Sequence, residues 1–461
     1  MIVLGGVLLA GYLALSLSRY AGFGSGVDLA IFGQAVRHLA AGRAPVVDLK
    51  APGFLAFGDH FDPVIALAAP LYRLWPDVRV LLWVQAVLVA VAVVIVADTA
   101  VGLLGRGRGL AVGAALGTSA GVQSAVDFDF HEVAFGAPLL ALSVRAYLHG
   151  RWRACAVLAA GLFAVKEDTA FVMVGLAVAL ALQGRYRLAT ALAAWAVAGL
   201  ALLLTVVIPA LSYWHRYTYL PHATGHGSVV TATARNLLDS LAVNGSAART
   251  AAVFMAGVGF AAARSGLVWA AAVPFAARAA NADHAYWGTG FHYNLLIEVV
   301  LFGALTDALR RRRSSRPPVW SLVAATAAAA LLHGPAAAAV SRSSCHRCTA
   351  ARTAVRLVPN GATVAADTYL LPHLVDRTTA YLLTPAFTDS AGRSLQPDWV
   401  LLDERSEAYG TSGLAAGLAA RLRTDYLPVW AGDGYLVLQR RSVAAAGNTA
   451  AADDPVRWSR P

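Results

Sequence analysis

Charged residues are scarce in this chain. Asp, Glu, Lys and Arg make up only 14% of its 461 residues, whereas about 25% is usual in soluble domains. Hydrophobic residues make up 58%, and the mean hydropathy is +0.59. A soluble core does not need so much apolar surface, whereas lipid-facing helices do. The composition therefore excludes an ordinary soluble fold and predicts an all-α polytopic membrane protein.

Cysteine is also rare, and its three copies exclude a disulfide scaffold. Cys155 lies in an apolar run and is expected to be a small core residue. Cys345 and Cys348 form a C-x-x-C pair. Because the chain has no second such pair, a four-cysteine zinc site is excluded. A local disulfide is the preferred interpretation if this segment faces outward.

The net charge of +11 is not gathered in one tail or on one face. The basic residues form short clusters between apolar runs, as is typical of loops that orient a membrane protein, so nucleic-acid binding is not expected. The first apolar run lacks a preceding basic region and a following A-x-A-like cleavage site. It is expected to be a retained helix in a multi-pass protein of the cell membrane.

Crossing about 30 Å of hydrocarbon takes about 20 apolar residues. Single spans are predicted at 2–18, 79–104, 109–126, 133–149, 188–211, 247–263, 266–280, 293–309 and 318–340. Short loops with arginine are placed in the cytoplasm: Arg106/Arg108, Arg151/Arg153, Arg185/Arg187, Arg264 and Arg310–Arg313. The stretch 154–183 then has cytoplasmic loops at both ends, so it must cross twice, as two short helices. About eleven crossings result, with the N-terminus inside.

From about residue 350 the chain no longer has long apolar runs. Residues 363–366, 399–402 and 435–438 are typical of short buried strands, and helices are expected near 349–358 and 412–423. The sequence predicts a transmembrane domain at 1–340, a small extracytoplasmic α/β domain at 341–440 and a disordered tail at 441–461.

Two polar groups follow the first predicted span. Asp28 begins a segment of amphipathic helical spacing that is expected to lie on the membrane surface. Asp28 could cap this helix and complement its dipole, or it could act as a general base at the outer lipid–water boundary. Asp59 and His60 precede an apolar run that extends to Leu74 and looks interfacial.

Two more groups lie in very short loops. One of these loops contains four possible ligands for a divalent cation, the one candidate cofactor: Asp127, Asp129, His131 and Glu132. Alternatively, these side chains could simply be the water-facing polar groups of a short loop. Lys166, Glu167 and Asp168 could be a self-neutralising hairpin tip. Alternatively, the lysine could bind a phosphate while the acids orient it. In the histidine- and aromatic-rich outward loops, Arg216 and His292 are the better functional candidates, because most of the rings are expected to be interfacial anchors.

Several short motifs together resemble a bacterial membrane-protein family, that of the domain of unknown function 2079. They are Asp28–Gln34, Gly58–Pro63, Phe128–Glu132, Lys166–Asp168 and Phe291–Tyr293, and in the tail Val358–Pro359, Pro372–His373, Asp376–Arg377 and Asp398–Asp403. The resemblance covers about residues 15–440. The Ala- and Arg-rich composition resembles that of a high-GC actinobacterium.

That family is similar in architecture to the C-type (GT-C) glycosyltransferases, which use polyprenyl-phosphate sugars and carry a catalytic acid directly after the first helix. Asp28 occupies this position, but Leu29 and Ala30 follow it, so a two-acid metal motif is absent. The resemblance implies a cell-envelope enzyme in the lipid bilayer that takes a sugar from a polyprenyl-phosphate donor. Asp28 is the expected base, Asp59 and His60 help to orient the acceptor or the base, and Gln34, Lys166, Glu167, Asp168, Arg216 and His292 bind substrate.

Two other functions stay open. Charges within apolar helices are also typical of transporters and flippases, although the polar groups gather at the outer ends of the helices and no inverted repeat is evident. A non-enzymatic envelope scaffold is the third possibility. Convergence of the polar groups on one outward cavity would favour the enzyme.

Overall fold

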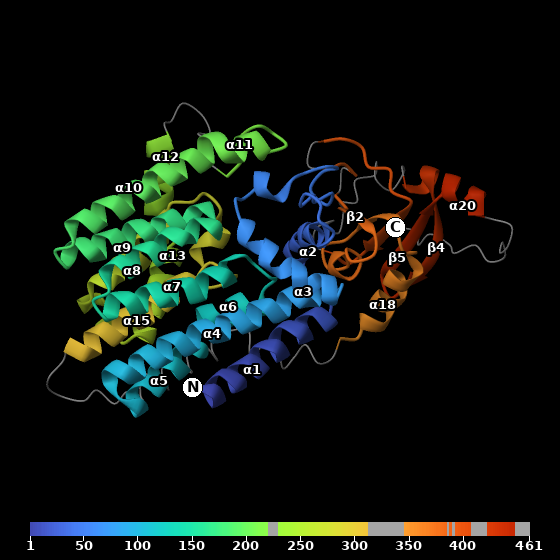
Figure 1. Cartoon of the computed structure of the whole chain (residues 1–461). Coiled ribbons are helices and arrows are strands. Elements are labelled where there is room, and N and C mark those ends of the chain that lie inside the picture. The colour runs from blue at the N-terminus through green and yellow to red at the C-terminus, as the bar shows by residue number, and fades with distance from the viewer. Residues whose placement is uncertain (220–228, 312–344, 385–386, 390–391, 407–421, 448–461) are drawn as a thin grey trace. The chain divides into compact units, whose positions relative to one another are not determined.

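The computed structural model describes residues 1–219, 229–311, 345–384, 387–389, 392–406 and 422–447 (Figure 1). The chain forms two compact units. The first comprises Met1–Ser18, Phe57–Ile65 and Leu82–Ser341, and the second comprises Arg19–Ala56, Ala66–Leu81 and Arg342–Pro461. The first is helical and the second contains the sheet, which confirms the expected combination of a mostly helical chain with a small C-terminal sheet domain. The second unit also includes two segments near the N-terminus that the sequence assigned to the transmembrane domain.

The first unit contains helices, most of which follow the predicted apolar spans of the sequence. They are α1 (Ile2–Ala21) and α4 (Arg79–Leu104), both of which pass into the second unit, and α5 (Arg106–Gly117), α6 (Ala120–Asp127), α7 (Val133–Leu148), α8 (Trp152–Ala160), α9 (Ala170–Leu182), α10 (Tyr186–Leu202), α11 (Ile208–Leu211), α12 (Val229–Leu238), α13 (Ser246–Gly257), α14 (Trp269–Ala279) and α15 (Leu295–Arg311). Short 3-10 or π segments are η1 (Ala56–Gly58), η2 (Pro63–Ala68), η3 (Gly161–Ala164), η4 (Glu167–Thr169), η5 (Leu203–Val207), η6 (Asp239–Val243), η7 (Ala261–Arg264), η8 (Gly266–Val268) and η9 (His284–Trp287).

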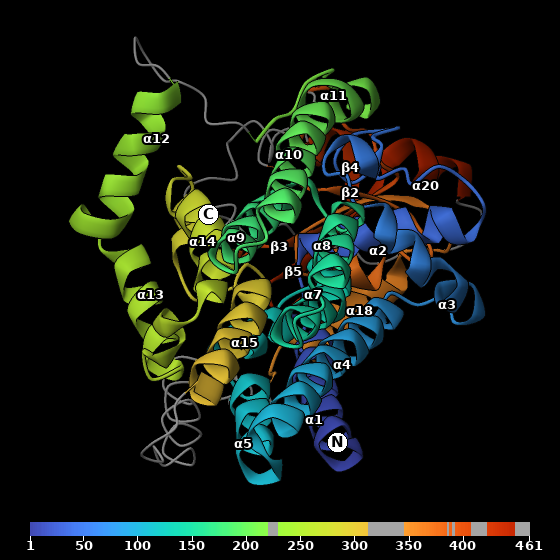
Figure 2. The same cartoon turned by 60° about the vertical axis from the view of Figure 1, so that its left-hand side comes forward.

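Helix α9 packs between α10 and α14 (Figure 2). The approach to α14 is very close, because a β-carbon at Gly175 would lie 2.2 Å from the carbonyl oxygen of Trp269. Small residues permit such close packing between apolar helices. Helix α9 begins directly after the loop that carries Lys166, Glu167 and Asp168, so its packing fixes the position of that loop. The two short helices expected on either side of the charged triplet are present as α8 and α9.

Eleven membrane crossings are not confirmed. Among the described residues three helices are long and apolar enough to span a membrane, Ile2–Ala21, Arg79–Leu104 and Tyr186–Leu211. A fourth candidate is the pair α5 and α6, which is bent by 45°. Shorter apolar helices occupy Pro63–Leu74, Val133–Leu148, Trp152–Ala164 and Gly266–Ala279. The predicted span at 318–340 lies outside the described residues.

A buried carboxylate stabilises the bend between α5 and α6. Glu298, on α15, accepts hydrogen bonds from the backbone N–H groups of Gly121 (3.0 Å) and Val122 (3.3 Å) and from the Ser119 hydroxyl. These donors lie at the N-terminus of α6, where unpaired N–H groups and the helix dipole favour a negative charge. The interruption of this candidate span is therefore part of the packed structure.

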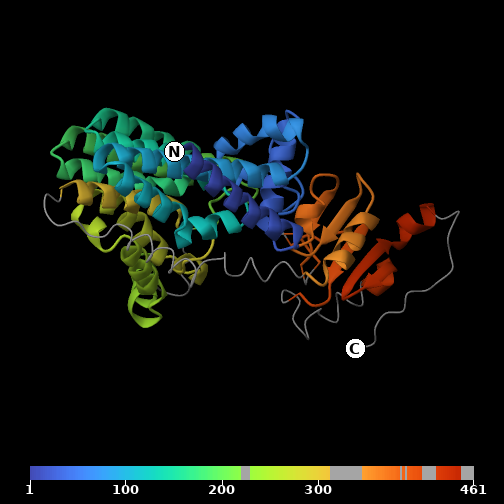
Figure 3. The ribbon, with the colours of Figure 1, turned by 90° about the horizontal axis from the view of Figure 1, so that it is seen from below.

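The second unit contains a five-stranded mixed sheet of order β2-β1-β3-β5-β4, drawn in orange to red in Figure 3. Strand β1 is parallel to β2 and β3, and β5 is antiparallel to β3 and β4. The elements are α2 (Val27–Ala40), α3 (Ala69–Leu74), α18 (Cys348–Leu357), β1 (Thr363–Ala366), η10 (Leu371–His373), β2 (Thr379–Leu382), β3 (Trp399–Asp403), β4 (Tyr426–Gly432), β5 (Tyr435–Arg440) and α20 (Arg441–Gly447).

The three predicted strands are confirmed as β1, β3 and β5, and the helix near 349–358 is α18. Strands β2 and β4 were not anticipated. The prediction of a disordered tail at 441–461 was wrong at its start, because residues 441–447 form α20. This helix packs on β5 and β4. Most of the predicted helix at 412–423 lies outside the described residues.

Helix α2, predicted to lie on the membrane surface, has several buried apolar side chains. Leu29, Phe32 and Val36 are at most 9% exposed. A β-carbon at Gly33 would lie 2.9 Å from a methyl group of Val78 and 3.1 Å from one of Val375, so glycine is required for this close contact. Ile31 and Leu39 of the same helix are partly exposed, so the membrane-surface position of α2 stays a prediction.

Polar side chains join the early segments of the second unit to its C-terminal part. Asp376 accepts hydrogen bonds from the Tyr72 hydroxyl (2.6 Å) and the Val78 N–H (2.9 Å). The Arg37 guanidinium donates to the carbonyl oxygens of residues 375 and 378. The expected local disulfide joins Cys345 and Cys348, and the third cysteine, Cys155, is free and buried as expected.

Candidate functional site

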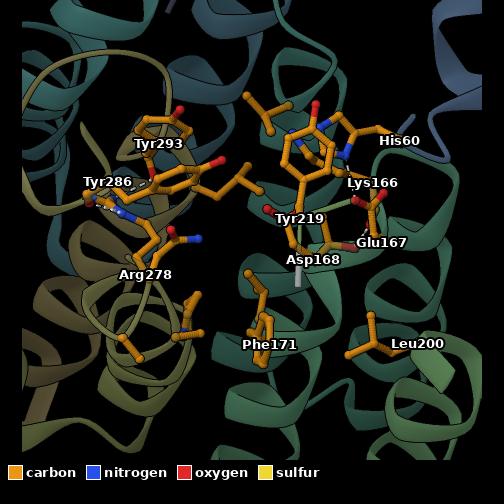
Figure 4. Close-up of a pocket in the computed structure, with 18 of the residues that line it drawn as sticks. His60, Lys166, Glu167, Asp168, Phe171, Leu200, Tyr219, Arg278, Tyr286 and Tyr293 are labelled. Carbon is orange, nitrogen blue, oxygen red and sulfur yellow. Dashed lines mark hydrogen bonds and ion pairs between the residues drawn. The ribbon is translucent and has the colours of Figure 1, made fainter. Parts of the chain in front are cut away.

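One cavity of about 370 Å³ lies within the first unit and is lined by loop residues and by helices α9, α10, α14 and α15. Its ionisable and aromatic lining residues are His60, Lys166, Glu167, Asp168, Tyr217, Tyr219, Arg278, Tyr286, His292 and Tyr293. Its apolar lining residues include Phe171, Leu200, Leu204, Pro274, Leu296 and Ile297. Figure 4 shows the labelled polar groups together, with Phe171 and Leu200 below them. The cavity thus has a polar region and an apolar region.

Glu167 holds His60 at the polar region. Its carboxylate lies 2.6 Å from His60 Nδ1 and also accepts hydrogen bonds from the Phe61 N–H (3.1 Å) and the Tyr217 hydroxyl (3.1 Å). Burial opposes ionisation of Glu167, but the attraction and hydrogen bond of His60 outweigh it and lower the pKa of Glu167 to about 2. Because an ionised carboxylate only accepts hydrogen bonds, Nδ1 of His60 carries the proton and Nε2 is the nitrogen left for a ligand.

Lys166 forms the second ion pair of the cavity. Its ammonium lies 2.9 Å from Glu132, whose side chain is 1% exposed. Burial would lower the pKa of Lys166, but the charge of Glu132 and those of the neighbouring acids raise it well above its ordinary value. Lys166 is therefore charged. An ammonium has three donors, and the pair with Glu132 leaves donors for a ligand in the cavity.

Asp168 differs from the other carboxylates of the cluster. It is the exposed member of the triplet and lines the cavity. Within the described parts of the chain its carboxylate has no hydrogen bond or ion pair. Protein encloses the group on its other sides, and this desolvation raises the pKa of Asp168 to about 6, although the charge of Lys166 opposes the shift.

The opposite wall of the cavity is organised by Arg278, on α14. Its guanidinium donates five hydrogen bonds to the loop that precedes α15, to the carbonyl oxygens of residues 286, 288 and 293 and to the side chain of Asn294. No carboxylate pairs with it among the residues that the structure describes. Arg278 therefore holds Tyr286 and Tyr293, whose rings stack at 4.4 Å, and brings a positive charge to this wall.

A stacked pair of imidazoles lies beside the cluster. The ring centroids of His131 and His292 are 3.5 Å apart. His131 Nδ1 donates a hydrogen bond to the Asp129 carbonyl oxygen at 3.0 Å. Burial, followed by the charges of His131 and Lys166, lowers the pKa of His292 well below its ordinary value. His292 is therefore a neutral lining group and not a cation at neutral pH.

The four predicted metal ligands do not form a metal site in this structure. Among the described residues, no group of three or more His, Cys, Asp or Glu side chains is arranged to hold an ion. Asp127 and Asp129 are buried, and Glu132 is paired with Lys166 instead. The ligand set expected from their spacing in the sequence is therefore not assembled.

The other predicted site residues fall into three groups. His60, Lys166, Glu167, Asp168 and His292 line the one cavity, and Asp59 supports it by accepting a hydrogen bond from the Tyr219 hydroxyl at 3.0 Å. Arg216 is exposed in the loop after α11 and is not a lining residue.

Asp28 and Gln34 belong to the second unit. Asp28 is half-buried in the first turn of α2. Gln34 is 3% exposed, donates to the Ala380 carbonyl oxygen (2.9 Å) and accepts from the Leu49 N–H (3.0 Å). These contacts join α2 to strand β2 and to the loop that follows α2, so they give Gln34 a structural role.

Sequence reasoning missed Arg278 and Tyr219. Arg278 stands inside the predicted apolar span 266–280, and a charge within such a run is itself a functional signal. Tyr219 gave no comparable signal, because its position depends on a ring stack with His60 at 4.5 Å.

Comparison with solved structures shows a similar fold. The chain is similar to ArnT from Cupriavidus metallidurans bound to undecaprenyl phosphate, with a TM-score of 0.58 and 11% identity over 94% of this chain and 97% of that one. This likeness confirms the expected similarity in architecture to C-type glycosyltransferases. No curated protein matches the chain.

Comparison with family models agrees with the motifs. The model described as "Predicted membrane protein (DUF2079)" matches residues 20–437. That range contains every motif quoted above, from Asp28–Gln34 to Asp398–Asp403. The chain therefore belongs to the family of membrane proteins that share the domain of unknown function 2079.

Proposed function

We propose that this protein is a glycosyltransferase of the outer membrane face that moves a sugar from a polyprenyl-phosphate donor to an acceptor. The observation that carries the proposal is the composition of the cavity. Charged and hydrogen-bonding groups occupy one region, and the side chains of Phe171 and Leu200 line another. A ligand that suits both regions has a polar head and an apolar chain, as a polyprenyl-phosphate sugar does.

The polar region suits the head of such a donor. Lys166 offers the phosphate a charge-assisted hydrogen bond, and Arg278 adds a positive charge that no described carboxylate pairs with. As the bond between sugar and phosphate breaks, negative charge grows on the phosphate, and fixed cations stabilise that charge most strongly in the transition state. Arg216, predicted for the same role, is less suited because it is exposed and does not line the cavity.

The architecture supports the same class of ligand. ArnT, which is similar over nearly its whole length, is bound to undecaprenyl phosphate. Such a chain would lie along the apolar side chains of α9, α10 and α15 that line this cavity. Tyr219, Tyr286 and Tyr293 provide flat rings and hydroxyls for a sugar.

Transfer also requires a base for the acceptor hydroxyl. The family resemblance implies Asp28, with His60 or Asp59 orienting the acceptor. His60 fits an orienting role, because Glu167 fixes its ring by a 2.6 Å hydrogen bond while the ring borders the cavity. A carboxylate of the cavity itself is the alternative base.

Binding is tested with the full-length protein in lipid nanodiscs. Undecaprenyl phosphate is expected to raise the Tm, and undecaprenol, which lacks the phosphate, to raise it less. Lys166→Met should weaken the response to undecaprenyl phosphate selectively. Equal responses to both lipids would mean that the cavity does not recognise the phosphate, and the proposal would fall.

Catalysis is tested with a panel of undecaprenyl-phosphate monosaccharides. The enzyme is expected to release undecaprenyl phosphate from at least one donor in the presence of envelope extract as a source of acceptor. If every donor is recovered intact but one of them crosses the membrane of sealed proteoliposomes, the protein is a flippase and not a transferase.

A further inference from the structure

We infer that Asp168 is the proton-accepting group of the cavity and serves as the general base of transfer in place of Asp28. This inference rests on the proposed function, because a general base is needed only if the protein transfers a sugar. Its structural basis is independent, because Asp168 is an accessible carboxylate at the border of the cavity (Figure 4).

The neighbouring carboxylates already have other partners or lie away from the cavity surface. Glu167 accepts from His60, from the N–H of Phe61 and from Tyr217. Glu132 is paired with Lys166 and is 1% exposed. Asp62 is 4% exposed and does not line the cavity.

Asp168 combines access with suitable basicity. Its backbone is fixed in the short 3-10 segment Glu167–Thr169, at the start of α9. The burial that raises its pKa to about 6 makes it a stronger base than an ordinary aspartate, while most of it is still ionised at neutral pH. A catalytic base works best when its pKa lies near the operating pH.

The proposed step transfers one proton and one sugar. The acceptor hydroxyl gives its proton to the Asp168 carboxylate, and its oxygen forms a bond to the anomeric carbon of the donor. The bond from that carbon to the phosphate oxygen breaks, and the electron pair leaves with polyprenyl phosphate. Asp168 then returns the proton to water.

A labelling experiment tests Asp168 without any substrate. Dicyclohexylcarbodiimide adds to protonated carboxyl groups in apolar surroundings, and peptide mass spectrometry locates the adduct. Labelling of Asp168 in the full-length protein is expected to be half-maximal near pH 6 and to fall when undecaprenyl phosphate is added. Asp98, which pairs with Arg145 at 2.7 Å outside the cavity, should stay unlabelled over the same range. Absence of label on Asp168 between pH 5 and 8 would overturn the inference.

Activity then distinguishes the two candidate bases. Asp168→Asn keeps the size of the side chain and should lower transfer at least 100-fold while leaving the undecaprenyl phosphate response in the Tm assay intact. Asp28→Asn should retain far more activity. The reverse ranking would return the role to Asp28. If the wild type consumes no donor although Asp168 is labelled and protected, the proposed transfer fails while the assignment of Asp168 as the proton acceptor of the cavity survives.

Discussion

His60 Nδ1 lies 2.6 Å from Glu167 Oε1 and joins two segments that are 107 residues apart in the chain. The carboxylate is almost completely buried, whereas the imidazole is 23% exposed and borders the cavity. Glu167 therefore has a mainly positioning role, and His60 presents a ring nitrogen to a ligand.

This pair predicts a specific loss of stability in acid. Because the pKa of Glu167 is about 2 in the folded protein, below its ordinary value of 4.5, its charge stabilises the fold above pH 4.5. That contribution is about 3 kcal/mol, and it is lost as the pH falls from 4.5 towards 2. Thermal unfolding of Glu167→Gln in detergent should show a lower Tm than wild type at pH 7 and a smaller difference at pH 3. A difference that does not change with pH would contradict this account.

The ion pair of Lys166 and Glu132 predicts strong coupling between two substitutions. Removal of either partner leaves a buried charge uncompensated, so Lys166→Met or Glu132→Gln alone should each cost about 3–5 kcal/mol of stability. The double variant leaves neither charge and should cost much less than the sum. The cycle is measured by unfolding in one detergent at one pH, and additive effects would show that the two groups do not interact.

Arg278 predicts a large effect of a conservative substitution. Lysine keeps the charge of Arg278 but cannot reproduce the planar fork that reaches three carbonyl oxygens and Asn294. Arg278→Lys should lower the Tm by several degrees and weaken the response to undecaprenyl phosphate. Arg216→Lys is the matched control, because Arg216 is exposed and outside the cavity lining, and it should leave both quantities near wild type.

The disulfide and the buried free cysteine predict how many thiols react in the native, reduced and denatured protein. Cys345 and Cys348 are joined and Cys155 is buried, so the native protein should take up almost no maleimide without reductant. Reduction should expose two more thiols, and denaturation should then expose the third. Two reactive thiols in the unreduced native protein would show that the disulfide is not formed.

The sequence predicted those site residues that differ in polarity from their neighbours along the chain. Lys166, Glu167 and Asp168 interrupt an apolar stretch, and a charge there has a high desolvation cost unless it is paired or wet. The structure places all three at one cavity. His60 was predicted because it did not fit its apolar surroundings, and it was found beside Glu167.

Roles that depend on distant partners could not be predicted in the same way. Gln34 was assigned to substrate from its motif alone, yet its side chain is bound to a strand 346 residues later. The metal site expected at Asp127–Glu132 failed for a similar reason. Glu132 has a partner in Lys166, from another loop, and short spacing along the chain did not imply convergence in space.

The discontinuous make-up of the second unit has a consequence for biosynthesis. Its segments Arg19–Ala56 and Ala66–Leu81 leave the ribosome long before the strands that complete the unit, which begin at Thr363. Until then α2 lacks its contacts with Leu371–His373 and Val375 and its hydrogen bond to Ala380, so this unit cannot complete its folding in step with translation. Its assembly must be one of the last events in maturation. A chain truncated before β1 should be recognised by quality control even though most of its membrane helices are already made.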